Sequence, residues 1–191
     1  MIPAWNLQGV IPPIRPGAAG HDPDRSPYKS PLHVLVDVMG TSHARLQIID
    51  GFLSFRSEIH KLGINAGFQW LNGSFSENVE STEGRDPRDV DVVTFLELPE
   101  GEDEASLVAK NPQLFDHDYV KEAYRVDSYW EVLGVPMEAQ SIQRISYWHS
   151  MWSHRRDGMW KGFVQVDLEC TQDPVAVQAL AQVKADLRGA P

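Results

Sequence analysis

The sequence of 191 residues contains a single cysteine, Cys170. One cysteine excludes a disulfide framework within the chain, and it excludes a structural zinc site built from several cysteines. Such a composition is typical of a reducing compartment, so we expect a cytoplasmic protein. We expect Cys170 itself to be a small residue in or near the core rather than a nucleophile.

Long apolar runs are missing as well. No stretch approaches the roughly 20 residues that a membrane-spanning helix needs, so we expect no association with a membrane. The start of the chain is rich in proline and lacks the apolar segment of a signal peptide, so we do not expect a secretory leader.

Positive charge is scarce, because 17 Lys and Arg residues face 27 Asp and Glu residues and the formal net charge is −10. Proteins that bind nucleic acid without sequence preference normally carry a basic excess, so we do not expect a broad nucleic-acid surface. Clustered carboxylates suit a site for divalent cations instead. The hydrophobic fraction of 42% and the length are ordinary for a single globular domain.

The first 31 residues contain seven prolines. Proline fixes φ and removes a backbone donor, so residues 1–31 are predicted to be neither a regular helix nor a central strand. We interpret them as an ordered arm that wraps around a single domain formed by residues 32–191; a disordered tail is the alternative. The apolar anchors of this arm are expected to be Trp5, Leu7, Val10, Ile11 and Ile14.

Hydrophobic periodicity in the remainder predicts both helices and strands. The predicted helices span 32–39, 42–62, 116–124, 140–152 and 176–187, and the predicted strands span 66–71, 90–98, 126–133 and 162–168. This order predicts an α/β (α+β) fold in which helices flank a small mixed β-sheet. The polar stretch 76–88 is expected to be partly loop, and the acidic run 100–104 a solvated loop.

Residues 68–95 carry the most informative pattern. A predicted strand leads into Gly73 and Ser74, and the next strand begins with Asp89 and Asp91. Side chains two positions apart on a strand point the same way, so the two carboxylates can converge on one point. Carboxylates held this close repel each other unless a cation lies between them, and their oxygen atoms suit Mg²⁺ or Mn²⁺.

The Gly-Ser turn has a matching role in this interpretation. Gly73 lacks a Cβ, so a phosphate group can approach its backbone closely. Exposed N–H groups at a turn attract anions, and the hydroxyl of Ser74 adds a donor for a phosphate oxygen.

The combination resembles the polymerase-β-type nucleotidyltransferase superfamily, as a compact stand-alone bacterial member. The signature of that superfamily is a Gly-Ser turn, a short gap and Asp-x-Asp on the next strand, with a third carboxylate on a later strand. Here the turn is Gly73-Ser74 and the pair is Asp89 and Asp91, and the motif covers about 60 of the 191 residues. The whole chain also resembles an uncharacterised bacterial family placed near these enzymes, including its SHRRDG segment.

The resemblance implies a nucleotidyltransferase-like fold and the transfer of a nucleoside monophosphate from an NTP, such as ATP, to a hydroxyl group. The acceptor would be a protein, a tRNA end or a small molecule, and the setting a toxin–antitoxin or phage-defence system. Metal ions would be held by three carboxylates. The third is expected to be Asp127, by its order and spacing, with Asp167 as the rival. The alternative is a non-catalytic, antitoxin-like partner protein that binds a nucleotide; the oligomeric state stays open.

A second cluster spans residues 153–162 and concentrates positive charge in an acidic chain. It contains His154, Arg155, Arg156 and Lys161. Arginine suits bidentate contact with phosphate, so this cluster is expected to bind the triphosphate or an acidic partner. The alternative is a solvated loop whose charges pair with nearby Asp and Glu residues.

Other acidic residues are interpreted as structural. Glu77, Glu80 and Glu83 are expected to lie in a solvated loop rather than to assist a metal ion. Residues 116–118 (Asp-His-Asp) are expected to cap a helix rather than to ligate a metal. A metal-dependent phosphohydrolase usually needs His ligands, and no histidine lies between residues 68 and 98.

Overall fold

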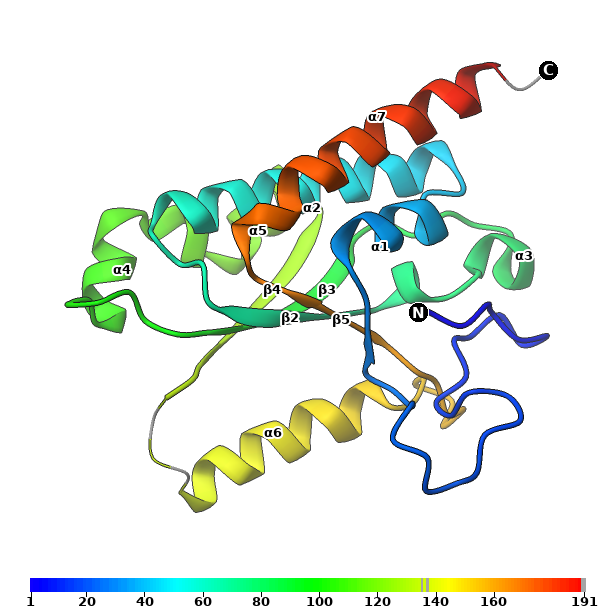
Figure 1. The fold of residues 1–191 in the computed structure, drawn as a ribbon, viewed down its shortest axis with the longest axis horizontal. Coiled ribbons are helices and arrows are strands. Elements are labelled where there is room, and N and C mark those ends of the chain that lie inside the picture. Colours follow the sequence, from blue (N-terminus) through cyan, green and yellow to red (C-terminus); the bar gives the residue numbers. More distant parts are fainter. Residues whose placement is uncertain (135, 137, 190–191) are drawn as a thin grey trace.

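The structure is a computed structural model that describes residues 1–134, 136 and 138–189. Figure 1 shows a five-stranded sheet with helices on both faces. The elements in chain order are β1 (Tyr28–Lys29), α1 (Leu32–Met39), α2 (His43–Lys61), β2 (Gly67–Asn72), α3 (Val79–Glu83), β3 (Val90–Leu96), α4 (Glu104–Lys110), α5 (His117–Tyr124), β4 (Val126–Val132), α6 (Ala139–Trp152), β5 (Val164–Asp167) and α7 (Asp173–Gly189).

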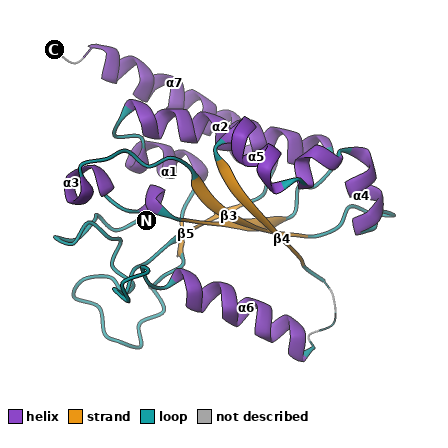
Figure 2. Cartoon of the chain, turned by 180° about the vertical axis from the view of Figure 1, so that it is seen from behind, coloured by secondary structure: helices purple, strands orange, loops and turns teal. Residues whose placement is uncertain are grey.

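The sheet is mixed, and its strand order is β1-β5-β2-β3-β4. Strand β2 pairs antiparallel with both β3 and β5, whereas β3 and β4 pair in parallel, as do β1 and β5. Helices α1, α2, α5 and α7 cover one face of the sheet, and α6 lies on the other (Figures 1 and 2). The expected small mixed sheet with flanking helices is therefore confirmed.

The longest predicted helix forms as expected. The Ser42 side chain accepts a hydrogen bond from the backbone N–H of Arg45, which caps the start of α2. The helix ends at Lys61, and Gly63 follows with a φ of 82°, a left-handed conformation that glycine adopts without strain. No helix among the described residues is both long and apolar enough to cross a bilayer.

Two apolar clusters lie on opposite faces of the sheet. Val90 and Val92 of β3 point into the larger cluster, which α1, α2 and α7 complete. Val93 and Phe95 point to the other face, into a mainly aromatic cluster that includes Trp152 of α6. Strand β3 is thus buried on both faces, which fixes its position firmly.

The proline-rich segment 1–31 packs against the rest of the chain. Ile2, Val10 and Ile11 are buried, and the Tyr28 hydroxyl donates to the carbonyl of Pro12 at 2.8 Å. The arm also supplies the edge strand β1. One predicted anchor is wrong, because the Leu7 side chain is fully exposed.

Several local predictions need correction. Cys170 is exposed, because it lies in a short turn between β5 and α7 rather than in the core. Helix α3 lies within residues 76–88, which were expected to be partly loop, and the sequence analysis did not predict helix α4. Helix α4 begins within the acidic run, where Asp103 and Ser106 form a reciprocal capping box. The Asp-x-x-Ser spacing of these two residues is typical of a helix start and could have predicted α4 from the sequence.

Helices α2 and α7 are joined by a buried ion pair. The Arg56 guanidinium has no exposed surface, and its Nη2 lies 2.7 Å from Oδ1 of Asp173. Its Nη1 donates to the side-chain oxygen of Gln69 on β2 at 2.6 Å. Burial alone raises the pKa of Asp173, but the neighbouring His60 and Arg56 outweigh it, so this pKa lies below its ordinary value.

Asp173→Asn is expected to lower the free energy of unfolding by about 3 kcal/mol at pH 7, because it leaves the buried Arg56 charge uncompensated. A depressed folded-state pKa stabilises the fold above the unfolded-state pKa of about 3.9, and this contribution is lost as the pH falls through the folded-state value. Urea denaturation at several pH values measures both effects. Asp186→Asn, an exposed change on the same helix, is the control. If the loss of unfolding free energy in Asp173→Asn stays the same at acidic pH, the ion pair between Arg56 and Asp173 would be contradicted.

Candidate active site

The Gly-Ser turn and the Asp pair lie together at one end of the sheet. Asn72, the last residue of β2, pairs with Asp91 near the start of β3, so the turn that follows β2 meets the carboxylates. Gly73 has a φ of 77°, and a Cβ at this position would lie 2.8 Å from the Asp91 carboxyl carbon. Only glycine therefore leaves the Asp91 side chain in its place without strain.

Strand register separates the two candidates for the third carboxylate. Asp127 of β4 is the direct partner of Asp91 in the parallel β3–β4 pair, so their side chains share a face. Asp167 is exposed, and it pairs with Phe68, at the other end of β2 from Asn72. The structure thus brings Asp127 to the Asp pair and leaves Asp167 away from it.

A cavity of about 680 Å³ opens at this end of the sheet. Its lining includes residues of the Gly-Ser turn, the starts of β3 and β4, the region of α3, helix α5, the end of α6 and the basic segment that follows α6. The predicted site residues that line it are Gly73, Ser74, Asp89, Asp91, Asp127, Arg155, Arg156 and Lys161. Cavities of this size hold cofactors and nucleotide-sized ligands in other proteins.

Asp91 carries an uncompensated charge. Burial raises its pKa most strongly, repulsion by Asp127 and Asp89 raises it further, and the result is about 6. Lys161 and Lys121 act in the opposite direction without cancelling the shift. In the described part of the chain, no side chain or backbone group makes a hydrogen bond or ion pair with the Asp91 carboxylate.

Helix α5 adds Lys121, which the sequence analysis did not single out, and His117, which it interpreted as part of a helix cap. Lys121 Nζ lies 2.6 Å from Asp127 Oδ2 and 3.1 Å from Asp89 Oδ2. His117 Nε2 lies 2.5 Å from the other Asp127 oxygen. Burial raises the pKa of Asp127, but these two contacts outweigh it and keep the pKa below its usual value.

The contact with Asp127 raises the pKa of His117. Residues 117 and 121 stand four apart on a helix that leads directly into β4, so they share a face; this spacing was the available signal. The predicted cap also holds, since the Asp116 side chain accepts a hydrogen bond from the backbone of Tyr119. Within the described ranges, no three acidic, His or Cys side chains converge as a ready-made metal group.

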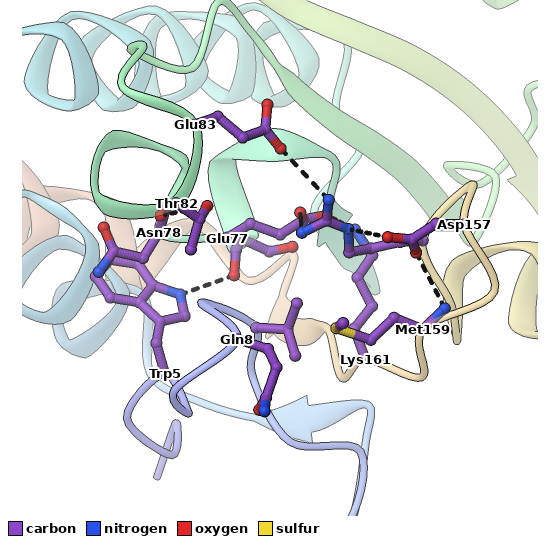
Figure 3. Close-up of polar contacts among 12 residues, drawn as sticks. Trp5, Gln8, Glu77, Asn78, Thr82, Glu83, Asp157, Met159 and Lys161 are labelled. Carbon is purple, nitrogen blue, oxygen red and sulfur yellow. Dashed lines mark hydrogen bonds and ion pairs between the residues drawn. The ribbon is translucent and has the colours of Figure 1, made fainter.

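The basic segment is paired with acidic residues while it lines the cavity. Lys161 is almost fully buried, and its Nζ lies 2.5 Å from the carboxylate of Glu77. Arg155 lies 3.6 Å from Glu77 and 3.5 Å from Asp157. Figure 3 shows Glu77, Asp157 and Lys161 in the same region. Arg156 is exposed and makes no ion pair with a described residue. Glu77 is therefore buried, and its predicted place in a solvated loop is wrong.

A buried arginine of α2 holds the loop that follows the turn. Arg45 donates from Nη1 to the Phe75 carbonyl at 2.7 Å, from Nη2 to the Glu77 carbonyl, and from Nε to Glu80 at 2.6 Å. Its guanidinium stacks on the Trp5 ring, and Trp5 Nε1 donates to the next loop carbonyl, that of residue 76, at 2.9 Å. Glu80 is thus also tied down rather than free in solvent.

Arg45→Met is expected to lower the free energy of unfolding by about 3 kcal/mol, because Glu80 and two loop carbonyls lose their buried partner. Amide hydrogen exchange of residues 75–80 should become faster than in the wild-type protein, since the loop loses its anchors. Arg88→Met removes an exposed arginine near the same loop and is the control. Unchanged exchange in this segment would show that Arg45 does not hold the loop.

Comparison with known proteins gives one match. A family model described as a family of unknown function (DUF6932) matches residues 3–167. No curated protein and no solved structure matches the chain. Because the family match covers most of the sequence, including the arm, the turn and all three carboxylates at the cavity, the chain belongs to this family of unknown function.

Proposed function

We propose that this protein is a metal-dependent nucleotidyltransferase that moves a nucleoside monophosphate from an NTP to a hydroxyl acceptor. The observation that carries the proposal is the register of β3 and β4, which sets Asp127 beside Asp91. Gly73 lies against the same carboxylate. The turn, the Asp pair and a third carboxylate therefore share one cavity, as the superfamily signature requires.

The donor set fits a hard divalent cation. Asp91 lies beside two other carboxylates with no hydrogen-bond or ion-pair partner in the described chain. Its pKa is raised mainly by burial and further by repulsion from Asp127 and Asp89, so a cation would stabilise its charged form. Asp89, Asp91 and Asp127 would hold Mg²⁺ or Mn²⁺ through oxygen atoms, which these ions prefer. When bound, such an ion would neutralise phosphate charge and make the acceptor hydroxyl more nucleophilic.

The chain's own residues suit the phosphates of an NTP. Gly73 and Ser74 both line the cavity, where the backbone N–H groups of the turn and the Ser74 hydroxyl would donate to phosphate oxygens. Arg156 is exposed at the cavity, and no described residue makes a hydrogen bond or ion pair with its guanidinium, which suits charged phosphate oxygens. Held by these groups, the triphosphate would be positioned and its charge offset, which is the main demand of phosphoryl chemistry.

The net charge of −10 bears on the acceptor. A tRNA would meet an acidic molecule whose basic residues at the cavity are partly paired, as Arg155 and Lys161 are with Glu77. A protein or small-molecule hydroxyl avoids that repulsion. We therefore favour these two acceptor classes over a tRNA end.

Asp127→Asn is expected to reduce transfer of label from an α-labelled NTP, in the presence of Mg²⁺, by at least about a hundredfold, because charge stabilisation at the reacting phosphate is lost. Asp89→Asn combined with Asp91→Asn should abolish it. Asp167→Asn is the matched control, since Asp167 lies away from the cavity, and it should retain wild-type transfer.

Three outcomes of that assay are decisive. The proposal is supported if transfer is lost in Asp127→Asn and retained in Asp167→Asn. Retained transfer in the double variant would defeat it. Tight NTP binding by the wild-type protein without any turnover, measured by calorimetry, would favour the non-catalytic partner protein instead.

Arg156→Gln is expected to raise the Kd for an Mg²⁺–NTP complex about tenfold, because one charge-assisted hydrogen bond to phosphate is lost. Isothermal titration calorimetry with a non-hydrolysable NTP measures the change. The control is Arg144→Gln on α6, which breaks an exposed pair with Glu131 away from this cavity. Equal affinities for Arg156→Gln and the wild-type protein would remove Arg156 from the binding site.

A further inference from the structure

The Lys121 side chain places a positive charge among the carboxylates at the cavity. The Lys121 ammonium lies between Asp89 and Asp127, within 3.1 Å of an oxygen of each. His117 occupies the second oxygen of Asp127. Two of the three carboxylates are therefore already bridged by a positive charge, while Asp91 is left open to the cavity.

The fold holds Lys121 in this place. Arg125, which follows helix α5, adopts a left-handed conformation with a φ of 57°, and its backbone N–H donates to the Lys121 carbonyl. Gly51 of α2 packs so closely on the end of α5 that a Cβ there would lie 2.0 Å from the Tyr124 carbonyl oxygen. Helix α5 cannot shift along α2, so the base of the Lys121 side chain stays beside Asp127.

The charges leave room for one more cation. With His117 neutral, the three carboxylates and the Lys121 ammonium group together carry two excess negative charges, which a single divalent ion neutralises. An ammonium group gives three hydrogen-bond donors and a compact charge, so it can satisfy carboxylate oxygens in the way a small cation does. A second divalent ion between Asp89 and Asp127 would meet the Lys121 charge at close range.

We propose that the Lys121 ammonium takes one of the two cation positions that three such carboxylates would otherwise provide, so that this protein binds one divalent ion per chain. The inference rests on the proposed function, because it assigns the cation content of that same site. Asp91 would be the main ligand among the three carboxylates for the single divalent ion, which would accompany the nucleotide. Lys121 keeps Asp89 and Asp127 together at the other position without a metal.

Counting bound Mn²⁺ tests the proposal. The full-length protein is titrated with Mn²⁺ in the presence of a saturating non-hydrolysable NTP, and free Mn²⁺ is followed by electron paramagnetic resonance. The wild-type protein should bind one ion per chain. Lys121→Met and Lys121→Gln should each bind two, because the place between Asp89 and Asp127 becomes free. Lys121→Arg keeps the charge and should bind one.

Lys110→Met on α4 removes a surface ion pair with Glu102 and is the matched control, so it should bind one ion. The Lys121 side chain is 42% exposed, so its replacement should leave the fold intact, and circular dichroism checks this. Two ions in the wild-type protein, or no gain in both neutral variants, would overturn the inference. The label-transfer assay tests the proposed function separately. Transfer by a wild-type protein that binds two Mn²⁺ ions would contradict only this inference, and one bound ion without transfer would contradict only the enzymatic proposal.

Discussion

Three carboxylates held at one end of a sheet repel one another, and much of the surrounding structure is arranged around that repulsion. The parallel pairing of β3 with β4 makes Asp91 and Asp127 neighbours, and burial strengthens the effect of their charges. Lys121 from α5 offsets part of the charge from one side, and Lys161 acts from the other. The negative charge that these lysines do not offset lies on Asp91, which lines the cavity, so a bound cation can neutralise it.

Helix α2 forms the frame of the molecule. It carries two fully buried arginines that extend from it to different elements: Arg45 holds the loop after the turn, and Arg56 ties α7 to β2. Buried charges of this kind are costly to desolvate, so they are tolerated only when their hydrogen bonds are complete. The two arginines fix the positions of segments that lie far apart in the sequence. The loop that follows Gly73 is held in place by the hydrogen bonds of Arg45.

Local patterns in the sequence were enough to predict the main helices and strands, because periodicity and capping act over a few residues, as at Ser42 and Gly63. They also placed the turn and Asp89 and Asp91 together, because the intervening chain is short. Order and spacing along the chain also favoured Asp127 over Asp167 as the third carboxylate. The register that makes Asp127 the direct partner of Asp91 is not encoded in local patterns. The contacts of Arg45 with Glu80 and of Lys121 with Asp89 join residues more than 30 positions apart, so local patterns could not predict them.

The contact of Trp5 with the turn loop has a practical consequence. This indole lies close to the amino end of the chain, stacks on the guanidinium of Arg45 and donates to a carbonyl of the loop beside Gly73. A tag or fusion partner joined directly to the first residue therefore pulls on a segment that supports the cavity wall. Purified material for ligand studies is best made with a long spacer at that end, or with the tag removed.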